Sequence, residues 1–343
     1  VSIVSIFIFD VLSNTVEPFT TEYINDLVIL GVMVGIIQFL FGVFGFGKFL
    51  RYIPISIISG FIQAAAIIII ISQFTTAFGI EFPDGGLKKI PYLFTHLHEL
   101  KLNTTLLFLI SIIFLFLFAV FFPRFPTSIS LVIVTGILSY LFDFEKYDLL
   151  LIGEVPNGLP ELIFPTVNIN SIKYLPGALG IAIIASIGSS MMSIKLESYQ
   201  PKKIKLNREY VSLGLAKIIS SFFGSMLSAG SFNRTILAYK IGGKTQITSI
   251  VSSIIILFTI LYLTPVVYYF PQSVIAAIIV YSVYFLFDFD LMIKLWREDK
   301  IELSYLFITM LFTLFIGFVE GIFLGVLIKY LGDYLYKKKI ILS

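Results

Sequence analysis

One stretch of this 343-residue chain places a cation among small and hydroxyl-bearing residues, between apolar neighbours. Residues 228–243 read SAGSFNRTILAYKIGG, with Arg234 near the centre. Ser231 or Asn233 could cap a helix that starts here, and the unpaired N–H groups of its first turn would then face an anion. At about 5 Å from a monovalent anion, and with an effective dielectric of about 20, Arg234 would contribute about 3 kcal/mol. The chemistry predicted for this stretch is therefore anion binding.

Arg234 has a second interpretation as a structural cation. Its guanidinium could pair with a carboxylate or with the C-terminus of a helix. Ionisable residues inside membrane segments are rare and usually functional, which favours the binding role. Neutralisation by an acidic neighbour, or a side chain directed out toward water, would count against that role.

A second group of small polar residues lies in the stretch IAIIASIGSSMMSIKL at 181–196. Gly188, Ser189 and Ser190 interrupt an otherwise apolar helix there. They could form one wall of a substrate cavity, or they could allow close packing of neighbouring helices, as small residues often do in membranes. The sequence leaves both interpretations open.

Other kinds of chemistry find little support. His96 and His98 lie two residues apart without further ligands nearby, so we expect no metal site. No Ser-His-Asp set, Walker loop or GxGxxG stands in a suitable context, so we expect neither an enzyme nor a cofactor. The chain has no Cys, which excludes disulfides and thiolate chemistry. Its net charge of +3 is scattered, which argues against a nucleic-acid partner.

The elements that must position these residues are predicted to be membrane-spanning helices. Hydrophobic residues make up 58% of the chain and charged residues 13%, against roughly 25% charged in soluble domains. A bilayer core of about 30 Å needs about 20 helical residues. The predicted spans are 26–46, 54–78, 104–122, 127–142, 174–196, 208–226, 246–268, 272–287, 303–318 and 319–335. The fold class expected is an all-α polytopic membrane protein.

Two further segments, 1–13 and 229–241, are apolar but too short for ordinary spans. Short or interrupted helices at corresponding positions of two halves indicate the binding site of an inverted-repeat transporter. If both count as crossings, the Lys and Arg clusters all fall on one side, which the positive-inside rule assigns to the cytoplasm. Residues 288–300 are predicted to form an amphipathic interfacial helix.

Several motifs resemble those of the sulfate permease (SulP) family of anion transporters. The strongest is NREYVSLGLAKIISSFFGSMLSAGSFNRTILAYKIGGKTQ, which begins at Asn207. Supporting stretches occur in the family's order along nearly the whole chain. They are IISGFIQAAAIIIIISQ at 57–73, GEVPNGLPELIFP at 153–165, YLTPVVYYFPQSVIAAIIV at 262–280, LWREDK at 295–300 and GFVEGIFLGV at 317–326.

The resemblance implies an inverted-repeat fold of seven plus seven spans, with a core and a gate domain. By that pattern 1–13 is the later part of span three, 174–196 is span eight and 229–241 is span ten. Anions are then held between the N-termini of spans three and ten. The substrate-binding residues carried over are Ser231, Phe232, Asn233, Arg234 and Thr235 from span ten and Gly188, Ser189 and Ser190 from span eight.

Compared with the pattern of the family, this chain is also expected to differ in several respects. Residues 1–343 would form a transmembrane anion-transport domain of about 12 of the 14 spans, incomplete at its N-terminus and without the STAS domain that usually follows. We therefore expect the chain as given not to transport by itself. Proton-coupled members usually carry a glutamate in span eight where this chain has Gly188, which favours exchange or uncoupled transport over proton symport.

The function expected is secondary transport of small inorganic anions, most of all sulfate, by alternating access. The alternatives within transport are exchange of bicarbonate, chloride or oxalate, symport coupled to protons or sodium, and a nucleobase permease of the same fold. A further alternative is a membrane scaffold or a voltage-responsive motor. The expected partners are the anion, the lipid bilayer and a second copy of the chain in a homodimer. The plasma membrane is the expected location, with the termini of the full-length protein in the cytoplasm.

Overall fold

The structure is a computed structural model. It describes residues 2–13, 15–17, 20–50, 53–80, 89–122, 125–154, 158–166, 169–197, 203–227, 229–230, 234–235, 238–239, 242–243 and 245–342.

Helices form the regular structure of the described residues, apart from one isolated bridge between Leu151 and Pro271. Short 3-10 turns cover Leu97–Glu99, Phe144–Tyr147 and Ile169–Tyr174. The α-helices are α1 (Ser2–Ser13), α2 (Thr21–Val43), α3 (Gly47–Leu50), α4 (Ile55–Ser72), α5 (Phe74–Phe78), α6 (Lys89–Thr95), α7 (Leu102–Phe121), α8 (Thr127–Phe142), α9 (Leu175–Glu197), α10 (Leu206–Ser221), α12 (Ile247–Tyr262), α13 (Thr264–Val267), α14 (Gln272–Tyr284), α15 (Phe289–Glu298), α16 (Lys300–Phe315) and α17 (Phe318–Leu342).

Each predicted span coincides with a helix or a helix pair, and the 12-residue α1 occupies the predicted short segment 1–13. By length and composition, five helical stretches among the described residues could cross a membrane, and two shorter helices are also apolar. The five are Thr21–Val43, Ile55–Phe78, Leu102–Phe121, Ser171–Ile194 and Gln272–Glu298, and the shorter two are Thr127–Phe142 and Ile247–Tyr262. The chain is therefore a multi-pass membrane protein, whereas the total number of its membrane crossings stays a prediction.

The chain divides into two compact units, each made of segments far apart in the sequence. Unit 1 contains Val1–Phe61, Pro160–Ile250 and Ser304–Ser343. Unit 2 contains Ile62–Leu159 and Val251–Leu303. All the residues predicted to bind substrate belong to unit 1.

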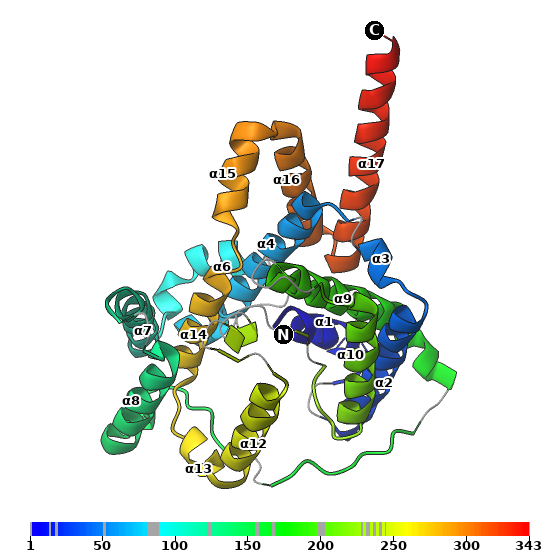
Figure 1. The fold of residues 1–343 in the computed structure, drawn as a ribbon. Coiled ribbons are helices and arrows are strands. Elements are labelled where there is room, and N and C mark those ends of the chain that lie inside the picture. The colour runs from blue at the N-terminus through cyan, green and yellow to red at the C-terminus, as the bar shows by residue number, and fades with distance from the viewer. Residues whose placement is uncertain are drawn as a thin grey trace. The chain divides into compact units, whose positions relative to one another are not determined.

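The centre of unit 1 is a tight antiparallel pair, α2 and α10, with α9 beside it (Figure 1). Glycines allow the two backbones to meet. A Cβ on Gly214 would lie 2.5 Å from the backbone N of Phe39 and 2.7 Å from the carbonyl O of Gly35. At the far end of the pair, Gly42 faces the carbonyl of Asn207 in the same way. Side chains at these glycines would therefore force the helices apart.

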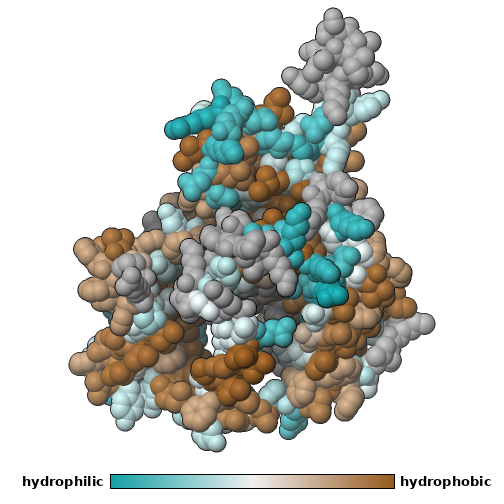
Figure 2. All heavy atoms as spheres, in the orientation of Figure 1, coloured by the Kyte–Doolittle hydropathy of each residue, from teal (hydrophilic) through white to brown (hydrophobic). Residues whose placement is uncertain are grey.

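Unit 2 is built around an apolar cluster. Its buried members come from α5, α7, α8 and α14, and they are Ala77, Phe108, Leu115, Leu131, Val274, Ala276 and Ala277. Large apolar side chains also cover the outside of α8, where Ile129, Ile133 and Leu141 are more than half exposed. In Figure 2 brown hydrophobic surface covers the region of α7 and α8. An exposed surface of this kind suits contact with lipid tails.

The predicted interfacial segment 288–300 contains the helix α15, which begins with Asp288 as its N-cap. The carboxylate of Asp288 accepts a hydrogen bond from the backbone N–H of Leu291 at 3.0 Å. Exposed apolar side chains, Ile293 and Trp296, and exposed charged side chains, Lys294 and Arg297, lie along this helix. The helix is thus confirmed, while its position at the membrane interface stays a prediction.

Candidate functional site

The candidate site is centred on the middle of α9, at Gly188. No described atom lies within 4 Å of the position that a Cβ on Gly188 would occupy. The next residue, Ser189, is fully buried and donates its hydroxyl to the carbonyl of Ala185 at 2.8 Å. Gly188 therefore faces open space on a helix whose neighbouring residues are packed, as the cavity-wall interpretation requires.

Ser190 has a different environment from Gly188. Its hydroxyl is hydrogen-bonded to the hydroxyl of Tyr210 on α10, and both side chains are buried. Tyr210 is therefore held between α9 and α10. Within the predicted triplet, Gly188 fits the wall of a cavity, whereas Ser190 fits the alternative of helix packing.

The segment that begins at 229 packs against the same part of α9. A Cβ on Gly230 would lie 3.1 Å from Sδ and Cε of Met192 and 3.6 Å from Oγ of Ser189. The hydroxyl of Thr235 donates to Sδ of Met192 at 3.1 Å. The absence of a side chain at Gly230 thus permits the approach that brings the two predicted site regions together.

Helix α1 also packs against α9. A Cβ on Gly177 would meet the side chain of Val11, and the hydroxyls of Thr15 and Tyr174 lie 3.1 Å apart. These contacts place the C-terminal end of α1 against the start of α9.

Arg234 lies in a helical stretch together with Thr235, and its side chain is exposed. Among the described residues, no carboxylate forms an ion pair with it. Residues 238–239 are also helical, in line with the predicted short helix. The other predicted contacts from this segment, Ser231, Phe232 and Asn233, lie outside the described residues, so the proposed N-cap does too.

A buried polar network lies on the side of α9 that faces α2 and α10, and the sequence analysis did not predict it. Lys217 of α10 is 2% exposed, and its ammonium donates to Oε1 of Gln38 at 2.5 Å. The amide nitrogen of Gln38 in turn donates to the hydroxyl of Ser186 at 3.2 Å, and both side chains are fully buried. The signal was present, because a single lysine interrupts the apolar stretch LGLAKIIS.

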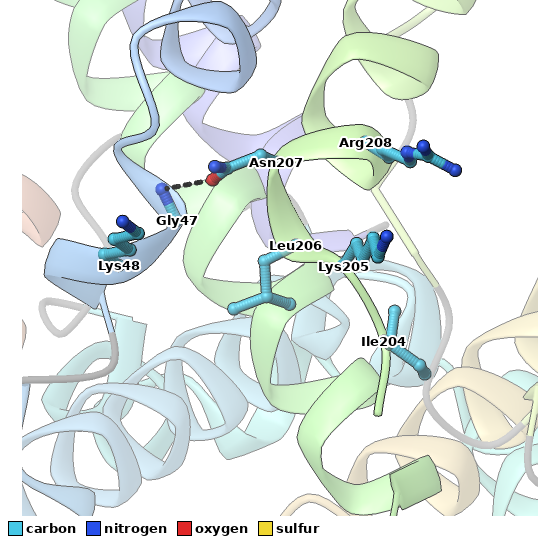
Figure 3. A pocket seen from close by; sticks show the side chains of 7 residues that line it. All are labelled: Gly47, Lys48, Ile204, Lys205, Leu206, Asn207 and Arg208. Atoms are coloured by element: carbon cyan, nitrogen blue, oxygen red, sulfur yellow. Dashed lines mark hydrogen bonds between the residues drawn. The ribbon is translucent and has the colours of Figure 1, made fainter. Parts of the chain in front are cut away.

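A basic pocket lies at one end of the α2–α10 pair and has a volume of about 590 Å³ (Figure 3). The backbone N–H of Gly47 donates to Oδ1 of Asn207 at 3.1 Å and joins the start of α3 to the start of α10. Lys48, Lys205 and Arg208 line the pocket. Two basic clusters that the sequence predicts to share one side of the membrane therefore do lie together.

Metal-ligating residues do not gather in the described part of the chain. No group of three or more His, Asp or Glu side chains that could hold an ion occurs there. His96 hydrogen-bonds instead to the neighbouring Thr95 hydroxyl at 2.8 Å and stacks on the ring of Tyr92. His98 lies 3.7 Å from a carboxylate oxygen of the neighbouring Glu99, so both histidines have local structural partners.

The known proteins that this chain resembles in sequence include transporters of sulfate and other anions. Sulfate transporter 4.1, chloroplastic, of Arabidopsis thaliana is 28% identical over 340 residues, which are 95% of this chain and 49% of that protein. The anion exchange transporter of Homo sapiens is 28% identical over 92% of this chain and 51% of its own length. The chain thus spans about half the length of the curated relatives that it matches. Both names are those of transporters, in line with the expectation that the chain is not an enzyme.

Solved structures show the same fold. The anion transporter murine solute carrier 26 family member A9, in its inward-facing state, matches with a TM-score of 0.86 at 23% identity, over 98% of this chain and 59% of that one. The transmembrane domain of a cyanobacterial bicarbonate transporter matches with a TM-score of 0.80 at 22% identity, over 93% of this chain and 81% of that one. These likenesses confirm the predicted all-α inverted-repeat fold. Because the model described as the sulfate permease family also matches residues 1–309, the chain belongs to the sulfate permease family.

Proposed function

We propose that residues 1–343 form the transmembrane anion-transport domain, of about 12 spans, of a secondary transporter of small inorganic anions, with sulfate as the main substrate. The observation that carries this proposal is the meeting of two segments, far apart in the sequence, at the middle of α9. Gly188 faces open space there, and Gly230 and Thr235 pack beside it. Short helical segments at such a place are typical of transporter binding sites.

Arg234 supplies the fixed positive charge of the proposed site. No carboxylate among the described residues neutralises it, and we propose that its exposed side chain faces the anion pathway rather than the outside of the protein. Ser231 and Asn233 are proposed to donate hydrogen bonds, Phe232 and Thr235 to border the anion, and Gly188 with Ser189 to form the opposite wall. Ser190, bonded to Tyr210, is proposed to support that wall from behind. The anion would exchange its hydration shell for these groups while the protein alternates between two openings.

The test is sulfate uptake by the full-length protein in proteoliposomes. Arg234→Gln is expected to reduce the rate at low sulfate by about 100-fold or more, because about 3 kcal/mol of attraction per unit of anion charge is lost. Arg208→Gln is the matched control, since it removes an exposed arginine of the same unit at the end of α10. Equal rates for Arg234→Gln and the unmodified protein would reduce Arg234 to a structural role.

Exchange or uncoupled transport is proposed over proton symport. Gly188 offers no titratable group where proton-coupled members of the family usually carry a glutamate, and one relative is named as an anion exchange transporter. Sulfate uptake should therefore respond to a second anion on the opposite side of the membrane more than to an inward proton gradient. Uptake that requires the proton gradient would contradict this proposal, and a panel of labelled sulfate, bicarbonate, chloride and oxalate would rank the substrates.

The membrane orientation is proposed from the basic pocket. Lys48, Lys205 and Arg208 mark one end of the α2–α10 pair, and the positive-inside rule assigns such an end to the cytoplasm. We propose the plasma membrane as the location, with cytoplasmic termini and a homodimeric assembly for the full-length protein. A cysteine introduced at Lys48 should react with a membrane-permeant reagent and resist an impermeant one in intact cells.

A further inference from the structure

The basic pocket at one end of the α2–α10 pair carries three positive charges that the described residues leave without an ion pair. Lys48, Lys205 and Arg208 line the pocket, and all three side chains are exposed. Among the described residues, no carboxylate forms an ion pair with any of them. The carboxylate of Glu197 on α9 is engaged elsewhere, because it accepts the backbone N–H of Ile204 at 2.7 Å. The pocket is therefore open to an anion.

Backbone donors at the start of α10 add to these positive charges. Lys205 is the N-cap of this helix, and its side chain forms no capping hydrogen bond. The N–H groups of Leu206 and Asn207, which also line the pocket, find no acceptor among the described residues. In Figure 3, Lys205 and Arg208 lie on one side of Leu206 and Lys48 lies on the other. Cations from two segments and the N–H groups of a helix start thus line the same pocket.

Apolar surface begins close to the basic end of α10. Arg208, Leu215 and Ile219 lie on one face of the helix, because their spacing matches whole helical turns. Leu215 is 46% exposed and Ile219 is 62% exposed. At 1.5 Å per residue, about 10 Å separates Arg208 from Leu215 along the helix axis. One exposed face of α10 thus changes from basic to apolar over a distance comparable with the thickness of a lipid headgroup layer, about 5–8 Å.

The end of α2 that meets the pocket also carries exposed apolar side chains. Ile36, Leu40 and Val43 share one face of this helix and are 45%, 40% and 57% exposed. The N–H of Gly47 bonds to the side chain of Asn207, which holds this end of the chain beside the start of α10. In Figure 2 brown hydrophobic surface covers the region of α2 and α10. Both helices therefore offer surface suited to lipid tails next to the basic pocket.

We propose that the basic pocket binds the phosphate of an anionic phospholipid headgroup, and that the acyl chains of this lipid lie along the apolar faces of α2 and α10. Basic pockets at the ends of membrane helices suit such headgroups. The volume of about 590 Å³ lies within the range of small-molecule sites, roughly 300–1,000 Å³. A soluble phosphate compound would use the same cations and N–H groups, but it would leave the adjacent apolar faces unused. The inference goes beyond the proposed function, because it needs only the membrane setting and no particular transported anion.

The test titrates the purified full-length protein with lipid and counts the bound lipids by native mass spectrometry. Phosphatidylglycerol and phosphatidylcholine with identical acyl chains are compared, and the affinity of the tightest site is determined for each. A cation near a membrane surface contributes about fivefold in affinity for an anionic lipid. The triple variant Lys48→Gln, Lys205→Gln, Arg208→Gln is therefore expected to bind phosphatidylglycerol about 100-fold more weakly, with phosphatidylcholine unchanged. Lys48→Arg combined with Lys205→Arg should keep the affinity of the unmodified protein.

Unit 2 provides a matched control in Lys294, Arg297 and Lys300. This set also consists of two exposed lysines and one exposed arginine, so its removal changes the net charge of the chain equally. Exposed carboxylates of Glu298 and Asp299 accompany these cations, and the ammonium of Lys294 lies 3.8 Å from Glu298. The triple variant Lys294→Gln, Arg297→Gln, Lys300→Gln should therefore keep the affinity for phosphatidylglycerol within about twofold.

Three outcomes of the titration would overturn the inference. They are equal affinity of the unmodified protein for the two lipids, unchanged affinity for phosphatidylglycerol in the folded pocket variant, and an equal loss of affinity in the control variant. Displacement of the lipid by an equal concentration of inorganic phosphate would overturn it too, since the pocket would then belong to soluble phosphates. If the pocket variant is not monodisperse, Lys48→Gln combined with Lys205→Gln replaces it, with an expected loss of about 25-fold.

None of these measurements involves sulfate, so the inference and the proposed function can fail independently of each other. A bilayer supplies its lipids in large excess, so the loss of about fivefold expected for Arg208→Gln alone leaves the pocket occupied. That variant therefore remains a suitable control for sulfate uptake.

Discussion

Buried polar side chains of the two units differ in the helices that they connect. In unit 1 they join helices, because Lys217 bonds to Gln38 and Gln38 bonds to Ser186 on a third helix. In unit 2 they bond to their own helix, as when Ser111 donates to the carbonyl of Leu107 at 2.6 Å and Thr135 to that of Leu131 at 2.7 Å. The hydroxyls of Ser111 and Thr135 thus find their hydrogen-bond acceptors within one helix. Among the described residues, three helices of unit 1 are thus joined by buried polar side chains, whereas Ser111 and Thr135 of unit 2 leave the contacts between their helices to apolar side chains.

Two helix glycines, one in each unit, also differ in the atoms that they face. Gly214 in unit 1 faces backbone atoms of α2, whereas Gly136 in unit 2 faces only the ring of Phe270, at 2.7 and 2.8 Å from a built Cβ. Backbone cannot move aside without displacement of a whole helix, but a ring can rotate. The polar contacts of unit 1 are therefore fixed by helices in direct contact, and their geometry should resist change.

The largest effect is expected from Gly214→Ala. The new methyl group would force α10 away from α2, which we expect to cost about 3 kcal/mol or more of unfolding free energy. Gly136→Ala, also within a helix, should cost about 1 kcal/mol or less, since the ring of Phe270 can shift. Thermal unfolding of the purified full-length proteins measures both. Equal destabilisation by the two substitutions would remove the contrast between the units.

An intermediate effect is expected from Ser186→Ala. This change removes the acceptor of the Gln38 amide in a fully buried place, which should cost about 1–3 kcal/mol of stability. The melting temperature of the purified full-length protein is the measurement. A variant as stable as the unmodified protein would mean that the network is not tightly coupled.

The smallest effect is expected from Thr135→Val in unit 2. The side chain keeps its shape and loses a hydroxyl that bonds to two carbonyls of its own helix, those of Leu131 and Val132, so stability should change by about 1 kcal/mol or less. Sulfate uptake should be unchanged. A loss of uptake without a loss of stability would show that polar groups of unit 2 also take part in transport.

Most of the fold could be predicted from sequence because long apolar runs have few alternatives in a bilayer. The helix α2, for example, covers most of the predicted span 26–46. The contact of Gly230 with Met192 could not be predicted from periodicity, since it joins segments far apart in the chain. The role of Ser190 was left open for the same reason, because its partner Tyr210 is on another helix.

Lys217 was overlooked for a more specific reason. It stands within the strongest family motif, and nothing in that motif indicates which side chain it would contact. Its burial and its amide partner became evident only with α2 placed against α10. The predicted contacts Ser231, Phe232 and Asn233 stay predictions, since they lie outside the described residues.

The direct backbone contact between α2 and α10 has a practical consequence for the study of transport. Two helices that meet without intervening side chains at Gly35 and Gly214 leave no room to slide or tilt against each other. Spectroscopic labels on their outer surfaces would therefore keep a constant separation throughout the turnover cycle. The distance between these two labels would serve as a fixed reference, against which the movement of any third label could be measured.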